Sequence, residues 1–301
     1  MALSSLERLF VGVSPVRLRD YDGSTNTDTD NAEAMSAVLA VRPLKYLCLR
    51  GLREATSLHR ILAYHGQTLR GLCLEPYDGH YAGGPAHGSW KHPKLAPNDI
   101  TLMAKTCPDL QELRLQIRRT EGNSQECDVY RSFGQLAKLR TLILDQHFDP
   151  RERGVGPETL RRLQPHLYPE EEEEDHKVDA VLFRTTLINA ATDETLALGI
   201  WDLVVSSQAS RRLQNLRIVP FGLNMYSMNE SYYLIFLARS FFVSRCGLEN
   251  PIVEEVGKMA WTVWQEDTHG PSGPHILPRG ADEVIAGLWP ALVGREDWST
   301  G

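Results

Sequence analysis

Three histidines stand close together in the segment 76–97, whose glycines and prolines predict a surface loop. Imidazole nitrogens and carboxylates are common zinc ligands, so His80, His87 and His92, with Asp78 nearby, could bind a divalent ion. However, no pair of these residues has the helical i, i+4 spacing or a known zinc-ligand spacing. We therefore favour a loop that happens to contain histidines and predict neither a metal site nor a cofactor. Binding of a metal or small ligand by this loop is the alternative.

The five cysteines are the other candidates for metal or redox chemistry. Their number is odd and none is paired as Cys-x-x-Cys, a pattern typical of proteins in a reducing compartment. Cys48 and Cys73 occupy the same position in two similar segments, 44–49 and 69–74, and could therefore lie on adjacent strands. We interpret them as two reduced thiols on the surface of a sheet.

The sequence contains no pattern of a known catalytic site. It lacks Gly-x-Ser-x-Gly, glycine-rich phosphate-binding loops and His-Glu-x-x-His. Its carboxylates are plentiful, but no spacing pairs them in a cleft. The sequence therefore predicts a protein that is not an enzyme.

A short leucine pattern, Leu-x-x-Leu-x-Leu, recurs along the chain and is the strand signature of leucine-rich repeats. The copies occupy residues 139–144, 110–115, 69–74, 44–49 and 213–218, with a degenerate copy at 6–11. Because side chains alternate between the two faces of a strand, the last two apolar residues of each copy point into one core. Copies stacked in a parallel ladder would share that core.

Parallel strands need crossover connections, usually helices, and helical patterns precede most copies of the repeat. Apolar residues at helical spacing fill 55–65, and Gly66 is expected to end that helix. The residues expected to cap other helices are Asn98, Asp128, and either Thr192 or Asp193. The alternation predicts an α/β fold, specifically a leucine-rich-repeat solenoid of parallel strands with crossover helices.

The copies are unevenly spaced, and the longer steps predict insertions at 76–97 and at about 150–178. The step from 139 to 213 is long enough to contain a further repeat. We expect the irregular solenoid to cover residues 1–225.

Beyond about residue 225 the leucine pattern stops. Residues 231–245 are strongly apolar and predict a helix followed by a short extended piece. Four of the six tryptophans lie in the last part of the chain, at Trp261, Trp264, Trp289 and Trp298. Because an open solenoid end exposes core leucines and a strand edge, we expect 226–301 to form an aromatic-rich C-terminal cap.

The net charge is -7, and six of the acidic residues form one run at 170–175, which leaves the remainder nearly neutral. This balance argues against a nucleic-acid-binding surface, which normally shows a basic patch. No apolar stretch is long enough for a transmembrane helix, and no signal peptide is evident at the N-terminus. We therefore expect a cytoplasmic or nuclear protein that binds no membrane.

The strand face opposite the core is the expected binding surface. Its mixed charge suits a folded protein partner better than a phosphate backbone, and tyrosine and arginine are frequent interface anchors. The residues expected to contact the partner on this concave face are Tyr46, Arg50, Glu75, Glu112, Arg114, Gln116, Asp145 and Arg217. In the loop 76–97, the expected contacts are Tyr77, Tyr81 and Trp90.

Over roughly residues 40–301, the chain resembles the leucine-rich-repeat region of fungal F-box proteins. The resemblance rests on the leucine strands and on the Leu-Ala-x-x-Ile-Trp sequence within 187–201, which precedes the copy at 213–218. It also rests on the Trp-Pro pair at 289–290, followed by the Asp-Trp pair at 297–298.

The resemblance implies an intracellular substrate-recognition subunit of a cullin-type ubiquitin ligase, whose F-box holds the adaptor while the repeats hold the target. The sequence departs from the family because it begins almost at once with a repeat strand and shows no F-box. We expect an F-box-like protein–protein interaction module that binds a target protein, and a ligase adaptor if an F-box is supplied elsewhere. The alternative is a repeat-only scaffold without a link to ubiquitin ligation.

Overall fold

The computed structural model describes residues 7–12, 36–52, 55–75, 93–148, 180–221, 237–246 and 250–258, and positions 284, 287 and 288. Eight strands in these ranges form one sheet whose spatial order follows the chain. The first six strands are parallel, namely β1 (Arg8–Gly12), β2 (Tyr46–Arg50), β3 (Gly71–Glu75), β4 (Glu112–Arg118), β5 (Thr141–His147) and β6 (Asn215–Phe221). Two antiparallel strands extend the sheet beyond β6, namely β7 (Arg239–Ser244) and β8 (Ile252–Lys258).

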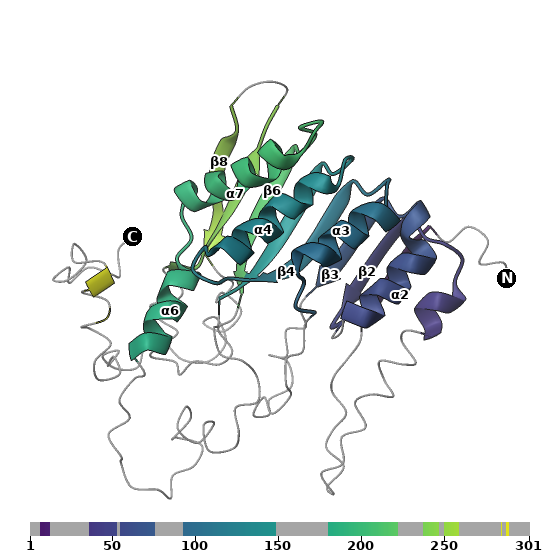
Figure 1. Cartoon of the computed structure of the whole chain (residues 1–301), viewed down its shortest axis with the longest axis horizontal. Helices are drawn as coiled ribbons and strands as arrows, with labels where there is room; N and C mark the ends of the chain where they lie inside the picture. The colour runs from purple at the N-terminus through teal and green to yellow at the C-terminus, as the bar shows by residue number, and fades with distance from the viewer. Residues whose placement is uncertain are drawn as a thin grey trace, which may run out of the picture.

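Four helices lie side by side over one face of this sheet (Figure 1). They are α2 (Ala55–His65), α3 (Pro97–Thr106), α4 (Ser124–Ser132) and α7 (Glu194–Ser207). The short 3₁₀ helices η2 (Gly66–Thr68) and η4 (Phe133–Gln135) follow α2 and α4. A further helix, α6 (Ala180–Ala190), lies near the end of β4, where its side chains bond to residue 121. The predicted α/β class and the strands at the leucine copies are confirmed.

The core lies between the sheet and the four helices. Leucines of each parallel strand alternate with residues on the other face, so that β4 places Leu113 and Leu115 in the core. In β5, Leu142 and Leu144 are fully buried in the same way. These leucines belong to one continuous hydrophobic cluster that runs from Val38 to β7.

Adjacent leucine copies pair position by position. Leu113 of β4 stands beside Leu142 of β5, which stands beside Leu216 of β6. The rows of leucines across the strands therefore come from equivalent repeat positions. A shift by one residue would turn the leucines of a strand away from the helices, which is why the core fixes the register.

Two of the expected helix caps are wrong, and one is confirmed. Helix α3 begins after Ala96, and Asp99 accepts a hydrogen bond from the Ala96 amide, so Asn98 is not the cap. Helix α4 begins four residues before Asp128, with Asn123 as its cap. Both predictions failed because several polar residues precede each apolar pattern, and only the chain path selects among them.

The cap of α7 is the confirmed one. The carboxylate of Asp193 accepts a hydrogen bond from the amide of Leu196 at 2.7 Å. Thr192, the other candidate, is buried, and its hydroxyl donates to the carbonyl of Ala190. This arrangement ends α6 and begins α7 within three residues.

Helix α2 ends at His65 as predicted, but Gly66 has a packing role there. Gly66 does not have the positive φ of a left-handed helix cap, which among the described glycines is found only at Gly51, Gly122 and Gly257. A Cβ atom on Gly66 would lie 2.6 Å from the carbonyl oxygen of Thr106 at the end of α3. Gly134 repeats this contact, because its Cβ atom would lie 2.5 Å from the backbone of Ser207 at the end of α7. Both glycines allow consecutive repeat units to approach closely.

Strand β5 pairs directly with β6 over seven positions, so in the described sheet no repeat strand lies between those of the last two leucine copies. The insertions proposed at 76–97 and about 150–178 lie outside the described residues, apart from positions 93–97. The extended piece expected within 231–245 is β7, which pairs antiparallel with the edge of β6. The four C-terminal tryptophans also lie outside the described residues.

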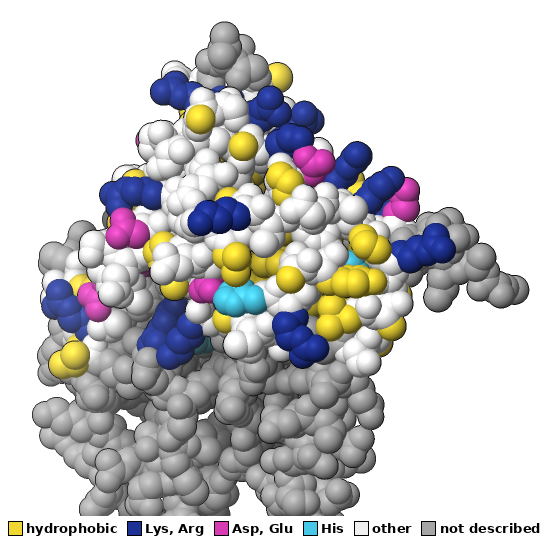
Figure 2. Space-filling model, turned by 45° about the vertical axis from the view of Figure 1, so that its right-hand side comes forward, with side chains coloured by type: hydrophobic (Ala, Val, Ile, Leu, Met, Phe, Trp, Pro, Cys, Tyr) yellow, Lys and Arg dark blue, Asp and Glu magenta, His cyan; other side chains and the backbone are white. Residues whose placement is uncertain are grey.

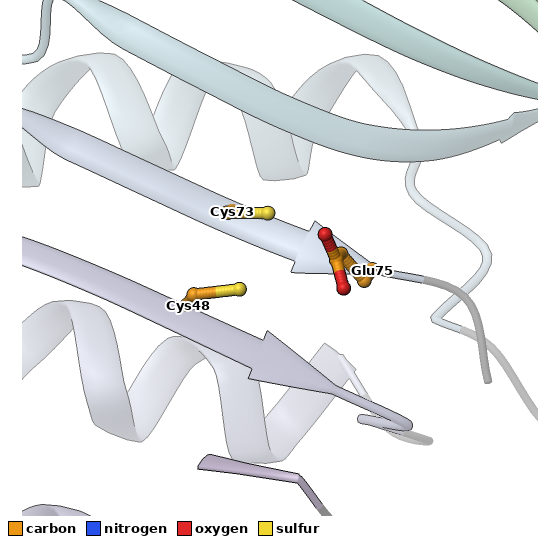
Figure 3. Close-up of side chains that lie close together, drawn as sticks. All are labelled: Cys48, Cys73 and Glu75. Atoms are coloured by element: carbon orange, nitrogen blue, oxygen red, sulfur yellow. The ribbon is translucent and has the colours of Figure 1, made fainter. Parts of the chain in front are cut away.

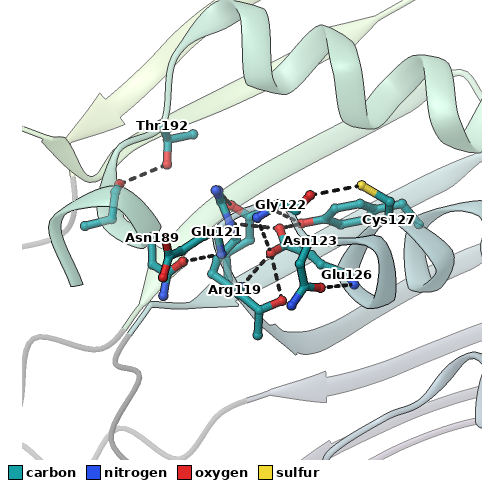
Figure 4. A network of polar contacts seen from close by, with 12 residues as sticks. Arg119, Glu121, Gly122, Asn123, Glu126, Cys127, Asn189 and Thr192 are labelled. Atoms are coloured by element: carbon teal, nitrogen blue, oxygen red, sulfur yellow. Dashed lines mark hydrogen bonds and ion pairs between the residues drawn. The ribbon is translucent and has the colours of Figure 1, made fainter. Parts of the chain in front are cut away.

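A buried polar network lies at the turn between β4 and α4 (Figure 4), and hydrogen bonds with Gln146 link it to β5. Arg119 and Glu126, both almost fully buried, form an ion pair with 2.9 Å between Nε and Oε1. The other oxygen of Glu126 accepts hydrogen bonds from the amides of Thr120 and Gly122. Tyr130 completes the cluster by donating to Glu126. The carboxylate thus satisfies the amides of the turn that connects β4 to α4.

The same turn is tied to α6. Glu121 and Gly122 both have positive φ values, of 59° and 70°, so the chain reverses sharply here. The side-chain oxygen of Asn189 accepts a hydrogen bond from the Glu121 amide at 2.7 Å (Figure 4). Thr185 donates to the Glu121 carboxylate. The turn therefore positions α6 relative to the sheet.

None of the helices in the described ranges has the length and apolarity that crossing a membrane requires.

Candidate functional site: the open face of the sheet

The sheet face opposite the four helices is the candidate binding surface, and we call it the open face. In the described ranges the helices α2, α3, α4 and α7 pack on the other side of the sheet. Each parallel strand contributes alternate residues to the open face. The strand register places Cys73, Arg114, Ile143, Arg217 and Phe242 in one row across five strands.

Arg114 lies at the centre of the open face and joins two carboxylates from neighbouring strands. Its guanidinium donates to both oxygens of Asp145 on β5, at 2.9 and 3.1 Å, and to Glu75 on β3, at 2.7 Å. Burial lowers the pKa of Arg114, but the hydrogen bonds that it donates to Asp145 and the negative charges of Asp145 and Glu75 together outweigh burial, so the pKa of the guanidinium is raised. The arginine is therefore charged and held in a fixed position.

A second contact on the open face involves an aromatic ring. The Arg8 guanidinium lies 4.6 Å from the centre of the Tyr46 ring, within the range of a cation–π interaction. Gly71, the partner of Tyr46 on β3, makes room for this ring, because a Cβ atom there would lie 2.5 Å from it. Because Gly71 has no side chain, the ring of Tyr46 can lie over the neighbouring strand β3.

The structure brings all eight strand residues predicted to bind a partner onto this face. Glu112 and Arg217 are exposed, whereas Tyr46, Arg50, Glu75, Arg114 and Gln116 are partly buried. Asp145 differs from the others because only 2% of its side chain is exposed. A buried carboxylate cannot contact a partner directly, so the role of Asp145 on this face would be to hold Arg114 in position. The loop residues Tyr77, Tyr81 and Trp90 lie outside the described residues, as do His80, His87 and His92.

Two cysteines and a carboxylate form a cluster near one end of the open face (Figure 3). Cys48 on β2 pairs with Cys73 on β3, as the sequence suggested, and Glu75 follows two residues later on the same face. One sulfur from each cysteine and one oxygen of Glu75 all lie within 4.8 Å of one another. The hydrogen bond between the two thiols lowers the pKa of Cys48, whereas the same bond and burial raise the pKa of Cys73.

The sequence alone does not predict this cluster. The equivalent positions of Cys48 and Cys73 indicate adjacent strands and predict only two thiols on the surface of the sheet. The available signal was Glu75, which alternation places on the same face two residues after Cys73. All five cysteines are free thiols in the structure.

A small hollow adjoins this cluster. Its lining residues are Leu52, Leu74, Glu75, Pro93, Leu95 and Gln116. This partly open hollow has a volume of about 10 Å³, which is about enough for one water molecule. The hollow is therefore too small for an organic substrate, but it leaves Glu75 beside a solvent-sized space.

The side of the molecule that carries the helices offers no comparable arrangement in the described residues. Figure 2, an oblique view turned by 45° from Figure 1, shows basic and acidic side chains spread over the described surface, with hydrophobic ones gathered around and to the right of one histidine. Exposed ion pairs such as Arg131 with Asp128 contribute to this mixture. Exposed pairs of this kind add little stability and mark no binding site.

In comparisons with known proteins, the chain matches no protein-family model, no curated protein and no solved structure.

Proposed function

We propose that this chain is a non-enzymatic leucine-rich-repeat protein that binds another protein on its open face. The observation that carries the proposal is the row of side chains centred on Arg114, which crosses five strands on the face opposite the helices. Four members of this row come from equivalent positions of the leucine copies, and Phe242 extends the row onto β7. Repeat proteins commonly bind partners on such extended surfaces.

The repeat interpretation is supported by three recurring features. Each leucine copy corresponds to one strand, and the first six strands are parallel and in register. The helices follow one another in chain order on one side of the sheet. Finally, Gly66 and Gly134 make the same close contact with the end of a following helix. A solenoid over 1–225 accounts for all three features.

The charge of the open face supports a protein partner over a nucleic acid. Arg114 is already paired with Glu75 and Asp145, so its charge is largely balanced within the protein. Arg217 is exposed on the same face, but Glu112 is exposed two strands away. A phosphate backbone would instead require a surplus of unbalanced positive charge.

Exposed apolar groups beside these charges also favour a protein surface as the ligand. Phe10 on β1 is 62% exposed and stands next to Cys48 in the sheet register. Ile143 and Phe242 lie partly exposed on either side of Arg217. Protein interfaces typically combine aromatic and arginine anchors with a polar rim.

The C-terminal segment 226–301 fits the role of a cap in this proposal. Strands β7 and β8 pair antiparallel next to β6 and cover its backbone edge. The outer strand β8 carries Glu254, Glu255 and Lys258. Charged residues on an edge strand discourage pairing with other chains, so this arrangement would end the solenoid.

The more specific form of the proposal is an F-box-like target receptor. The resemblance to fungal F-box proteins would make the open face the target-binding surface of a cullin-type ubiquitin ligase, with the adaptor bound through an F-box from elsewhere. Five free thiols are compatible with the cytoplasmic or nuclear location that this role needs. A repeat-only scaffold would use the same face without the ligase.

The test is affinity capture followed by measurement with the purified partner. The open-face variant combines Glu112→Arg with Arg217→Glu, which reverses two exposed charges and preserves the net charge. We expect a partner captured by the parent chain to bind this variant with at least about tenfold lower affinity, equivalent to about 1.4 kcal/mol. A ligase adaptor or cullin among the captured proteins would support the F-box-like form.

The matched control reverses a charge pair on the helical side, by combining Asp128→Arg with Arg131→Glu. These side chains are 57% and 50% exposed, so the double change should disturb the fold little. The control should keep the parent's affinity. Equal binding by the parent and the open-face variant, or loss of binding only in the helical-side control, would refute the proposed surface.

A further inference from the structure

We propose that Cys48, Cys73 and Glu75 form a binding site for a thiophilic divalent cation, with zinc as the expected ion. The two sulfurs and a carboxylate oxygen already lie within 4.8 Å of one another. In tetrahedral zinc sites, with Zn–S of about 2.3 Å and Zn–O of about 2.1 Å, ligand atoms are separated by roughly 3.5–3.8 Å. Small side-chain rotations would therefore bring the three groups to ligand distances.

The directions of the side chains support a shared ion. In Figure 3, both sulfurs point along their strands toward Glu75 instead of toward each other. Two sulfurs that form a disulfide must approach to about 2.05 Å, with their side chains directed at one another. The parallel directions of Cys48 and Cys73 therefore suit two ligands of one ion better than a cross-strand disulfide.

The site is built on two rigid, hydrogen-bonded strands. The register of β2 and β3 fixes Cys48 beside Cys73, and β3 itself fixes the spacing between Cys73 and Glu75. Arg114 donates to Oε1 of Glu75 and thereby orients the carboxylate. Metal ligands are typically oriented by hydrogen bonds of this kind from the surrounding residues.

The donor set and the surrounding charges select the class of ion. Two thiolates and one carboxylate are the ligands of zinc and related soft or borderline ions, whereas calcium and magnesium prefer oxygen ligands alone. Binding of a divalent ion releases the two thiol protons, and the ion offsets the charges of the two thiolates that result.

The cluster supplies three ligands, so a tetrahedral ion would keep a fourth position for water or for a group from a bound partner. Because all three ligands lie on the open face, that position would face the proposed binding surface. The metal site itself does not rest on the proposed function, since its ligands all come from this chain.

The experiment uses Co²⁺ as a spectroscopic probe of the full-length reduced chain, followed by competition with Zn²⁺. We expect about one equivalent of Co²⁺ to bind, with a sulfur-to-metal charge-transfer absorption and the visible bands of tetrahedral coordination. Zn²⁺ should displace it. Cys48→Ser and Cys73→Ser should each weaken binding at least about tenfold and reduce the charge-transfer band. Glu75→Gln should change the visible bands while the charge-transfer band remains.

The matched control is Cys246→Ser, which removes an exposed thiol from outside the cluster. It should leave the spectrum and the affinity unchanged, and thermal unfolding should confirm that all variants are folded. Three results would overturn the proposal: no sulfur-to-metal band in the parent, bands that persist in both Cys48→Ser and Cys73→Ser, or bands lost in Cys246→Ser. Partner binding is not measured here, so this test can fail independently of the proposed function.

Discussion

His65 shows how one buried polar side chain connects separate parts of the fold. Its Nδ1 atom accepts a hydrogen bond from the Leu44 amide at 3.2 Å, and its Nε2 hydrogen is donated to the carbonyl of Val38 at 3.1 Å. These bonds require the neutral imidazole, because a second ring hydrogen would face the Leu44 amide. Burial also lowers the pKa of His65, although the bond to Val38 acts in the opposite direction.

We therefore predict that His65 makes the fold less stable as the pH falls. Above about pH 6.5 the histidine is neutral in both states, so its contribution to stability is fully present. Below that value the unfolded chain binds a proton that the folded protein resists, and the free energy of unfolding decreases. His65→Gln should cost about 1–3 kcal/mol at neutral pH and should reduce this pH dependence.

Urea unfolding at about pH 7.5 and about pH 5.5 measures both effects of His65→Gln. Most carboxylates have already ionised in this range, so they add little to the slope. An unchanged difference between the two pH values in the variant would show that another group causes the pH dependence.

At the scale of elements, two glycines that follow helices allow each helix to approach closely the end of the next helix on the sheet. Gly134 in η4 lies against the backbone of Ser207 at the end of α7. Nearby, the side-chain nitrogen of Gln208 donates hydrogen bonds to the buried carbonyls of Leu136 and Leu139. These two carbonyls therefore have hydrogen-bond partners at this junction. The position has no room for even one methyl group.

We predict that Gly134→Ala destabilises the protein by about 1–3 kcal/mol, the usual cost of overpacking a close contact. The matched control is Gly199→Ala in the middle of α7, where a Cβ atom would meet nothing within 4 Å. Alanine favours a helix interior over glycine by roughly 0.5–1 kcal/mol, so this control should be neutral or stabilising. Thermal or urea unfolding compares the two. Similar effects of both substitutions would mean that the junction relaxes freely.

At the scale of the whole molecule, the burial of the leucine ladder differs between its centre and its first strand. Strands β4 and β5 have neighbours on both sides, and Leu115, Leu142 and Leu144 are fully buried. In β1, by contrast, Leu9 and Val11 are only partly buried, and β2 is the only partner strand in the described sheet. Stability in repeat arrays depends on such contacts between neighbours.

We therefore predict a gradient of hydrogen-exchange protection along the sheet. Amides of β5 should exchange only through global or large-scale opening, whereas those of β1 should exchange at least about a hundredfold faster through local opening. Mass spectrometry of peptides that cover the two strands measures this gradient under native conditions. Equal protection of β1 and β5 would show that the first strand does not open independently of the centre.

The sequence by itself determined the six parallel strands of this protein and most of their register, but not the antiparallel strand β8. Leucines with a period of two identify each strand from local residues alone, and stacking equivalent copies is the arrangement that buries all of them. The helix at 55–65 was predicted for the same reason, and Asp193 was one of the two residues predicted to cap α7, since both features depend on residues close together in the chain. The strand residues of the open face followed directly from the alternation.

The tertiary structure decided which of those residues interact and which polar groups are buried. Arg114 contacts Glu75 and Asp145 across three strands, and no local pattern predicts that Asp145 would be almost completely covered. The cluster of Cys48, Cys73 and Glu75 likewise depends on side-chain directions on two strands. Local spacing specifies the face on which a side chain lies, but distances between side chains depend on packing among segments far apart in the chain.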